Sequence, residues 1–348
     1  MSEALVTAIV VNYRSGDHLK TCLAGLLEDD RHLSKLLVVE NASGDDSHLP
    51  AILAAETDDR VTLTMSPVNL GLAGGVNLLL KQVETPYLAI LNPDVTVDPQ
   101  WLGPLVAEME KDPSVAVTCP MILIEGTGKV NSVGQIVHVT GVPFNRFLGH
   151  RAGSLDLRVH DVNGLHGAAF VIRTDVLRAL GGWDETGFLY GEDAALSWDI
   201  LLHGHRVVGV PESVVAHDYH LTMYPEKLHL LERNRWALVL SHLRVGRMLA
   251  LIPALLFSEF MVWGLCLRRG PKFITAKLRS YQWVWRNRRA ITSWRRRVFA
   301  REIYDAHRLR RNTSWTYPMS QILIVGTERG RSLRVPPGGL PTESGSRD

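Results

Sequence analysis

The chain has 348 residues, which is long for one simple domain and short for three. Hydrophobic residues make up 46% and charged residues 21%, an ordinary globular composition that excludes wholesale disorder, a collagen-like repeat and a disulfide-stapled miniprotein. The net charge of +2 hides an asymmetry, because residues 268–311 hold 15 Lys and Arg but only two acids. A basic segment of this kind indicates contact with an anionic surface, either nucleic acid or a membrane leaflet.

Short β-branched runs alternate with helical periodicity through the first half of the chain. We expect strands over Thr7–Asn12, Leu36–Glu40, Val61–Met65, Tyr87–Leu91 and Val115–Met121, and helices over His18–Leu27, Gly71–Gln82 and Gln100–Lys111. This alternation predicts an α/β fold whose mostly parallel sheet is flanked by helices. Sites in such sheets lie at the carboxyl ends of the strands, where the polar clusters 12–16, 40–46 and 92–94 fall.

The middle of the chain is less regular. Residues 126–165 show weak periodicity, and we interpret them as an irregular excursion or a hairpin. The later elements that we expect are strands over Gly167–Arg173, Arg206–Val210 and Ser213–Ala216, and helices over Thr174–Leu180, with Thr174 as its N-cap, and Glu192–His203.

Met248–Leu267 is a 20-residue apolar run that Pro253 and Glu259 interrupt and that basic residues flank. Its length would allow a membrane-spanning helix, but a carboxylate near the middle costs about 2.5–3.5 kcal/mol on insertion. The following stretch, Lys277–Arg301, mixes arginines with aromatic residues, the composition of an interfacial amphipathic helix. We therefore favour in-plane or re-entrant membrane association and leave a true span and an ordinary soluble tail as alternatives.

Four short motifs have both a chemical and a purely structural interpretation. The glycines of Asn69–Asn77 would let the backbone approach a phosphate, or would serve a tight turn before a helix. Asn92–Asp94 follows a strand, and its acid could hold a divalent cation or belong to a simple turn. Glu192 and Asp193 open a helix, where acids are common because of the dipole, and His217 ends a strand, where a metal or phosphate contact is possible.

In this order and spacing the motifs resemble those of the inverting family 2 glycosyltransferases. These are GT-A-fold enzymes that use nucleotide-diphosphate sugars, and the bacterial rhamnosyltransferase-like members are the nearest in pattern. The resemblance covers residues 5–240. The matching stretches are Ala8–Ser15, Leu37–Asp46, Asn69–Asn77, Leu91–Val95, Gly167–Asp193 and Val214–His217.

The resemblance implies a role for each matching residue. Asp193 would be the catalytic general base with Glu192 beside it, and Asp94 and His217 would hold Mg²⁺ or Mn²⁺ against the leaving diphosphate. The residues that would bind the nucleotide sugar are Val11, Asn12, Glu40, Asn41, Asn69, Gly71, Asn77 and Asn92.

The chain departs from the family's pattern at several places. Glu40 stands where members usually have Asp, and Asn92 stands at the first acid of the metal motif. Where the family has an acid, an arginine, a glycine and a serine, the chain has Ala195, Asp199, His220 and Thr222. Contacts with the acceptor therefore cannot be transferred from the family.

The resemblance implies transfer of a sugar, with rhamnose as the best guess, from a nucleotide-diphosphate sugar to a hydroxyl of a glycan or polyprenyl-linked glycan, with inversion. We expect a GT-A domain over residues 1–240, a helical, basic extension over 241–311 that meets an anionic membrane at the cytoplasmic face of the inner membrane, and an irregular tail over 312–348. Nucleic acid is not an expected partner. An inactive membrane-bound scaffold and a sugar nucleotidyltransferase are the alternative functions.

Overall fold

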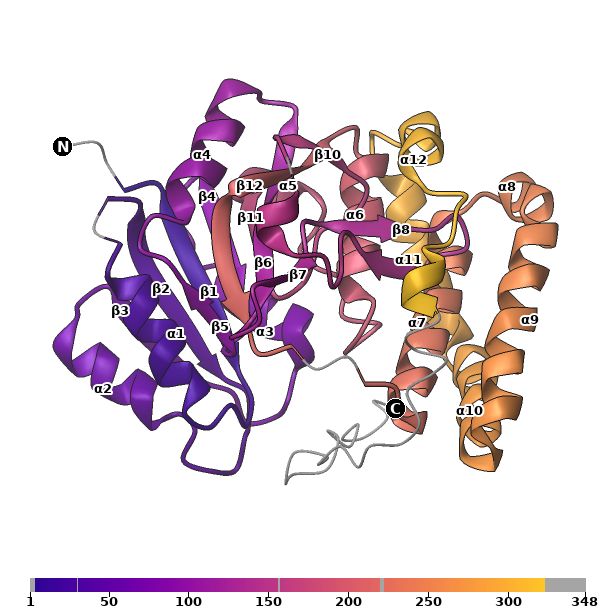
Figure 1. Ribbon diagram of the computed structural model, residues 1–348, viewed down its shortest axis with the longest axis horizontal. Helices are drawn as coiled ribbons and strands as arrows, with labels where there is room; N and C mark the ends of the chain where they lie inside the picture. The colour runs from indigo at the N-terminus through magenta and orange to yellow at the C-terminus, as the bar shows by residue number, and fades with distance from the viewer. Residues whose placement is uncertain (1–3, 30, 156, 220–221, 323–348) are drawn as a thin grey trace.

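The computed structural model describes residues 4–29, 31–155, 157–219 and 222–322, and shows one sheet between layers of helices (Figure 1). The strands are β1 (Val6–Asn12), β2 (Leu33–Glu40), β3 (Val61–Met65), β4 (Tyr87–Leu91), β5 (Val95–Val97), β6 (Val115–Ile124), β7 (Lys129–Ser132), β8 (Gln135–Val137), β9 (Pro143–Asn145), β10 (His160–Val162), β11 (Ala169–Arg173) and β12 (Arg206–His217). The helices are α1 (His18–Leu27), α2 (Leu49–Thr57), α3 (Gly71–Leu80), α4 (Leu102–Lys111), α5 (Thr174–Ala179), α6 (Glu192–Leu202), α7 (Pro225–His242), α8 (Val245–Ala250), α9 (Ile252–Arg269), α10 (Pro271–Arg286), α11 (Arg288–Ala300) and α12 (Ala306–Asn312).

The main sheet has the order β10-β12-β6-β11-β4-β1-β2-β3. The predicted parallel arrangement is confirmed for β3, β2, β1 and β4, and again for β6 and β12, while β11 runs antiparallel between the two groups. The β1–β2 register pairs Asn12 with Glu40, so the polar ends of these two strands meet at one edge of the sheet.

Helices bury both faces of the sheet, which explains why the central strands are largely apolar and are buried along their whole length. One core packs Leu23 of α1 and Leu105 of α4 against one face, and a second packs Val76 of α3 and Leu177 of α5 against the other. The short β8–β9 hairpin lies within residues 126–165, as one of the two interpretations of that segment predicts.

Several element predictions were wrong in detail. Thr174 is the first residue of α5 and makes no cap hydrogen bond, since Arg173 occupies the N-cap position. The two strands expected over residues 206–216 are one strand, β12, with an irregularity between Val210 and Val214 where Pro211 has no amide to donate. Helix α2 and strand β5 were not predicted, because α2 buries only Ala51 and β5 is three residues long.

The apolar 20-mer and the basic stretch form α8 to α11. The stretch interpreted as one interfacial helix is two helices with a break at Asn287, and its residues Trp294 and Val298 are buried in a core shared with Trp198 and Leu201 of α6. Within the part of the chain that the structure describes, no helix combines the length and apolar character needed to cross a membrane. The domain boundaries at 240 and 311 stay predictions, and the 323–348 part of the tail and His220 lie outside the described residues.

Candidate active site

The ends of β1 and β2 form a buried polar edge. The side-chain amide of Asn12 donates to the carboxylate of Glu40, and the backbone amide of Asn41 donates to the carbonyl of Asn12 at 2.8 Å. The second oxygen of Glu40 accepts from the backbone amide of Ser43 at 2.6 Å. Both Glu40 oxygens therefore hold the strand ends and the following turn in place.

Asn41 joins this edge to the start of α3. Its Nδ2 donates to Oδ1 of Asn69 at 3.0 Å and to the carbonyl of Gly71 at 3.2 Å, while its Oδ1 accepts from the backbone amide of Leu70 at 2.8 Å. The structure thus brings Asn12, Glu40, Asn41, Asn69 and Gly71 into one hydrogen-bonded cluster.

The glycines of α3 allow close packing on two sides. Gly71 has a φ of +71°, and a Cβ there would lie 2.5 Å from the carbonyl oxygen of Phe188. A Cβ on Gly75 would lie 2.9 Å from both methyl groups of Val11. Glycine at these positions therefore lets α3 press against β1 and against the loop that precedes α6.

Asn77 lies further along α3, apart from the Asn41 cluster. Its Nδ2 donates to the carbonyl of Trp183 at 2.7 Å and to Glu185 at 2.8 Å, and its Oδ1 accepts from the backbone amide of Trp183 at 2.8 Å. The amide of Asn77 is used to tie α3 to the loop before α6.

Pairing of β5 with the end of β12 brings Asp94 and His217 together. His217 pairs with Val95, and its Nε2 lies 3.4 Å from Oδ1 of Asp94. Nδ1 of His217 lies 3.0 Å from Oδ1 of Asn131 on β7, so Nδ1 carries a proton and Nε2 is the atom that faces Asp94. Burial raises the pKa of Asp94, but the hydrogen bond and charge of His217, together with smaller contributions from the backbone and His18, outweigh it, so the pKa of this carboxyl lies below its ordinary value.

The side chains of Asp94 and His217 suit a divalent cation whose other ligands come from a bound phosphate compound and water. Oδ1 of Asp94 is buried and makes no hydrogen bond, which leaves a carboxylate oxygen available beside the imidazole. No group of three or more His, Cys, Asp or Glu within the described ranges is placed to hold a metal ion. A cation at this point would complete its shell with phosphate oxygens and water, as Mg²⁺ commonly does.

The second acidic centre is the pair Glu192 and Asp193, which follow Gly191 at the N-terminus of α6. Oδ2 of Asp193 accepts from Nε2 of Gln135 at 2.7 Å and from the backbone amide of Gly167 at 3.3 Å. Burial raises the pKa of Asp193, and these donors limit the rise. Burial, and then the charge of Asp193, raises the pKa of Glu192 to about 8. The raised pKa of Glu192 favours its protonated form at neutral pH.

Two residues before β11 join the two centres. The backbone amide of Gly167 donates to Asp193, and the carbonyl of the next residue, Ala168, accepts from the backbone amide of Asn92 at 2.9 Å. Asn92 is the first residue of the motif that contains Asp94. The Asp193 carboxylate and the backbone of the Asn92–Asp94 motif thus contact adjacent residues of one short stretch of backbone.

Helix α7 holds the loop in front of α6. Phe188 and Tyr190 have φ angles of 61° and 64°, a region that costs a residue other than glycine about 1–3 kcal/mol unless its surroundings fix it. Nδ2 of Asn234 donates to the carbonyls of Gly187 at 2.9 Å, Leu189 at 2.9 Å and Tyr190 at 2.6 Å. One side-chain amide therefore sets the path of the chain into the acidic pair.

Asp199, which stands where the resembled family has an arginine, is buried on α6. Its Oδ1 accepts from Nε2 of His242 at 3.0 Å and from the guanidinium of Arg301. In this chain the arginine of this contact, Arg301, comes from the segment after α11. Asp199 supplies the α6 side of the pair.

Sequence reasoning missed three residues that support the two centres: Asn131, Gln135 and Asn234. The first two lie in a segment without periodicity, and the third lies inside a helix outside the motifs considered. The sequence offered one indication of this support, because Gly167 is the first residue of the stretch Gly167–Asp193, which resembles the family.

The sequence pattern of Glycosyl transferase family 2 matches residues 7–181, which is half of the chain. The chain belongs to glycosyl transferase family 2. The matched region holds the predicted nucleotide-binding residues and Asp94, and ends before Asp193 and His217.

Curated relatives of this family 2 glycosyltransferase include two bacterial proteins of different size. The chain is 29% identical over 222 residues to the O-antigen biosynthesis protein RfbC of Myxococcus xanthus, covering 60% of the chain and 17% of RfbC. It is 30% identical over 220 residues to the pre-mycofactocin glycosyltransferase of Mycobacterium tuberculosis, covering 62% of the chain and 43% of that enzyme. The chain therefore spans less than half of either relative.

A third relative matches over most of its length. The chain is 25% identical over 255 residues to the N-acetylglucosaminyl-diphospho-decaprenol L-rhamnosyltransferase of Mycobacterium tuberculosis, covering 66% of the chain and 82% of that enzyme.

Solved structures confirm the predicted GT-A fold. GalNAc-T7 with UDP, GalNAc and Mn²⁺ has a TM-score of 0.57 at 17% identity, over 69% of this chain and 48% of that one. Residues 1–349 of S. aureus TarS in complex with UDP-GlcNAc have a TM-score of 0.54 at 16% identity, over 90% of this chain and 93% of that one. At these identities the likeness concerns the fold.

Proposed function

We propose that this family 2 glycosyltransferase transfers a sugar from a nucleotide-diphosphate sugar to a hydroxyl of a glycan or polyprenyl-linked glycan. Rhamnose is the sugar that we propose first. The observation that carries the proposal is that Asp193 and the Asn92–Asp94 motif contact the adjacent residues Gly167 and Ala168, with Asp94 facing a histidine and Asp193 buried beside an acid of raised pKa. The mycobacterial relative named as a rhamnosyltransferase for a diphospho-decaprenol acceptor supports this choice of sugar and acceptor class.

Asp193 would act as the general base. The acceptor hydroxyl loses its proton to the Asp193 carboxylate as its oxygen attacks the anomeric carbon, a step worth about 10²–10⁴ in rate. Gln135 and Gly167 fix one oxygen of this carboxylate. A single base on one face, with the diphosphate leaving from the other, gives inversion at the anomeric carbon.

The Asp94 side of the site would hold the leaving diphosphate. A bound Mg²⁺ or Mn²⁺ would neutralise the charge that develops on the diphosphate. Oδ1 of Asp94 and Nε2 of His217 would hold that ion, and Asn131 would keep the imidazole oriented. The nucleotide would lie along the cluster of Asn12, Glu40, Asn41, Asn69 and Gly71, with Val11 and Asn92 beside it, while Asn77 would support this side of the site by tying α3 to the loop before α6.

A polyprenyl-linked acceptor would place the enzyme at the cytoplasmic face of the inner membrane, without a nucleic-acid partner. The chemistry itself can be tested apart from the membrane. Thermal unfolding of the full chain should be measured with dTDP-rhamnose, UDP-hexoses and GDP-mannose, each with Mn²⁺ and with EDTA. We expect dTDP-rhamnose with Mn²⁺ to raise the melting temperature most, because a ligand that binds only the folded state stabilises it.

The same measurement can refute the proposal. A larger shift with a UDP-sugar than with dTDP-rhamnose would overturn the choice of rhamnose. The absence of a shift with every nucleotide sugar would overturn nucleotide-sugar dependence, and shifts that EDTA leaves unchanged would overturn the metal site.

A further inference from the structure

Helices α8 and α9 present a continuous apolar surface at the outer edge of the molecule, where α9 lies at the far right of Figure 1. Residues three or four positions apart share one side of a helix, and this spacing recurs along both helices. The residues of this α8–α9 face, with side chains 45% to 74% exposed, are Val245, Leu249, Ile252, Leu256, Phe257, Phe260 and Leu267.

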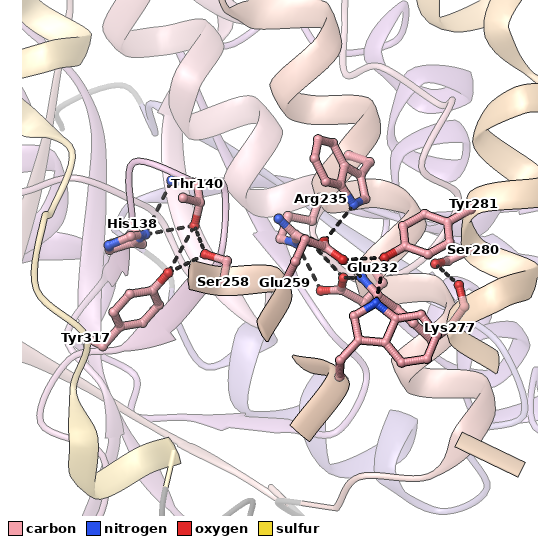
Figure 2. Close-up of polar contacts among 12 residues, drawn as sticks. His138, Thr140, Glu232, Arg235, Ser258, Glu259, Lys277, Ser280, Tyr281 and Tyr317 are labelled. Carbon is pink, nitrogen blue, oxygen red and sulfur yellow. Dashed lines mark hydrogen bonds and ion pairs between the residues drawn. The ribbon is translucent and has the colours of Figure 1, made fainter. Parts of the chain in front are cut away.

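Ser258 and Glu259 of α9 contact residues of other elements in the body of the protein (Figure 2). Ser258 donates to the hydroxyl of Thr140 at 2.9 Å. Glu259 accepts from Nζ of Lys277 at 3.0 Å and pairs with the guanidinium of Arg235. The carboxylate that counts against a membrane-spanning helix in the sequence is therefore paired with basic side chains of the protein itself.

From Leu249 to Leu267 the α8–α9 face is uncharged, and basic residues lie at both ends, with Arg247 inside α8. Glu259 is the one charged residue between Arg247 and Arg268, and it is the one that points inward. Arg244 lies exposed before the face, and Arg268 and Lys272 lie exposed after it.

We infer that the α8–α9 face docks in the plane of an anionic lipid bilayer. Its apolar side chains enter the boundary between headgroups and acyl chains, and the basic residues at both ends meet anionic headgroups. A second copy of the chain fits this face less well, because pairing in either orientation brings arginines against arginines. The inference that the enzyme meets a lipid-linked acceptor at this surface rests on the proposed function. The inference that the surface binds lipid rests on the contacts described above.

The test is flotation of the full chain with vesicles of phosphatidylglycerol and phosphatidylcholine, and with vesicles of phosphatidylcholine alone. We expect the protein to float with the anionic vesicles, and high salt to weaken this binding without abolishing it, because salt screens charge but not apolar contact. Protein that stays in the buffer with both kinds of vesicle would overturn the proposal.

Point variants separate the apolar from the basic contribution. Leu256→Gln combined with Phe260→Gln should lower binding to the anionic vesicles at least about tenfold, because two of the most exposed apolar side chains are lost. The matched control combines Leu53→Gln with Met65→Gln, which are 61% and 57% exposed on α2 and β3, and should float like the wild type. Arg268→Gln with Lys272→Gln should remove part of the salt-sensitive binding.

Two readouts keep the outcome specific. All these residues are exposed, so the melting temperature should stay unchanged and exclude unfolding as the cause. Donor hydrolysis without acceptor should also stay unchanged in the α8–α9 variants, while Asp193→Asn should float normally, so failure of the docking surface is distinguishable from failure of the proposed chemistry. A dimer in lipid-free solution that the Leu256 and Phe260 double variant dissociates would assign the face to a second copy and overturn lipid docking.

Discussion

Asp94 and Asp193 are the same chemical group in opposite surroundings, although Asp193 and the Asn92–Asp94 motif contact one short stretch of backbone. Asp94 faces an imidazole, and its pKa is lowered. Asp193 is buried beside Glu192 at a helix start, and its pKa is raised. The first environment favours a permanent negative charge, and the second favours a group that gains and loses a proton.

This difference in pKa supports the proposed division of roles between the two carboxylates. Paired titratable groups whose surroundings push their pKa values apart commonly divide electrostatic work from proton transfer. Each centre also has a supporting amide, Asn131 for His217 and Asn234 for the loop before Asp193. Variants at the two carboxylates and at the two amides therefore test the division directly.

Asp193→Asn should have the largest effect on turnover. Asparagine is nearly isosteric but accepts no proton at neutral pH, so sugar transfer should fall by at least about 10². Donor binding, measured by calorimetry, should stay within a few-fold of the wild type. Near-normal turnover in this variant would sink the assignment of the base.

Asp94→Ala should instead remove metal-dependent binding. Without its carboxylate oxygen, the site loses one of two protein ligands, and the affinity for Mn²⁺ in the presence of a nucleoside diphosphate should fall by more than about 10². Electron paramagnetic resonance of free Mn²⁺ measures this without turnover. Diphosphate binding that ignores both EDTA and this substitution would show that Asp94 holds no metal.

Asn131→Leu should weaken the same site less. Leucine cannot accept the proton on Nδ1 of His217, so the imidazole loses its orientation and Mn²⁺ affinity should fall about 10–100-fold. Asn131→Asp keeps an acceptor at this position and should restore the affinity. Equal loss in both variants would mean that Asn131 serves packing alone.

Asn234→Ala should act on the base side and leave the metal side intact. Loss of the amide that holds three loop carbonyls should lower kcat about tenfold, while KM for the donor and Mn²⁺ affinity stay unchanged. The matched control is Asn312→Ala, which removes one amide contact to the carbonyl of Arg308 in α12. A fall in melting temperature with kcat preserved would indicate a merely structural role for Asn234.

The sequence predicted the main strands because their apolar runs are buried on both faces, and it indicated most of the candidate site because polar residues gather at the strand ends. The sequence indicates Asp94 and His217 as separate candidates, but its hydrophobic pattern does not predict β5, whose three residues bring the two together. Asn131 and Asn234 act through side-chain hydrogen bonds between distant segments, which no local periodicity encodes. The inward turn of Glu259 was hidden for the same reason, since its partners come from α7 and α10.

Glu192→Gln should have the smallest kinetic effect and a clear effect on stability. Glu192 already carries the proton at neutral pH, so a neutral glutamine should keep sugar transfer within a few-fold of the wild type. The folded protein raises the pKa of Glu192 from 4.5 to about 8, so the stability that its protonated form provides is complete below the lower value and is lost as pH rises to the upper one. The loss is at most about 1.4 kcal/mol for each pH unit in this window.

Glutamine does not titrate, so the variant should gain stability relative to the wild type as pH rises through this window. Urea unfolding of both proteins at a series of pH values measures the difference. A variant that loses transfer as completely as Asp193→Asn, with no pH-dependent gain in stability, would show that Glu192 is the charged member of the pair and would reverse the roles of the two acids.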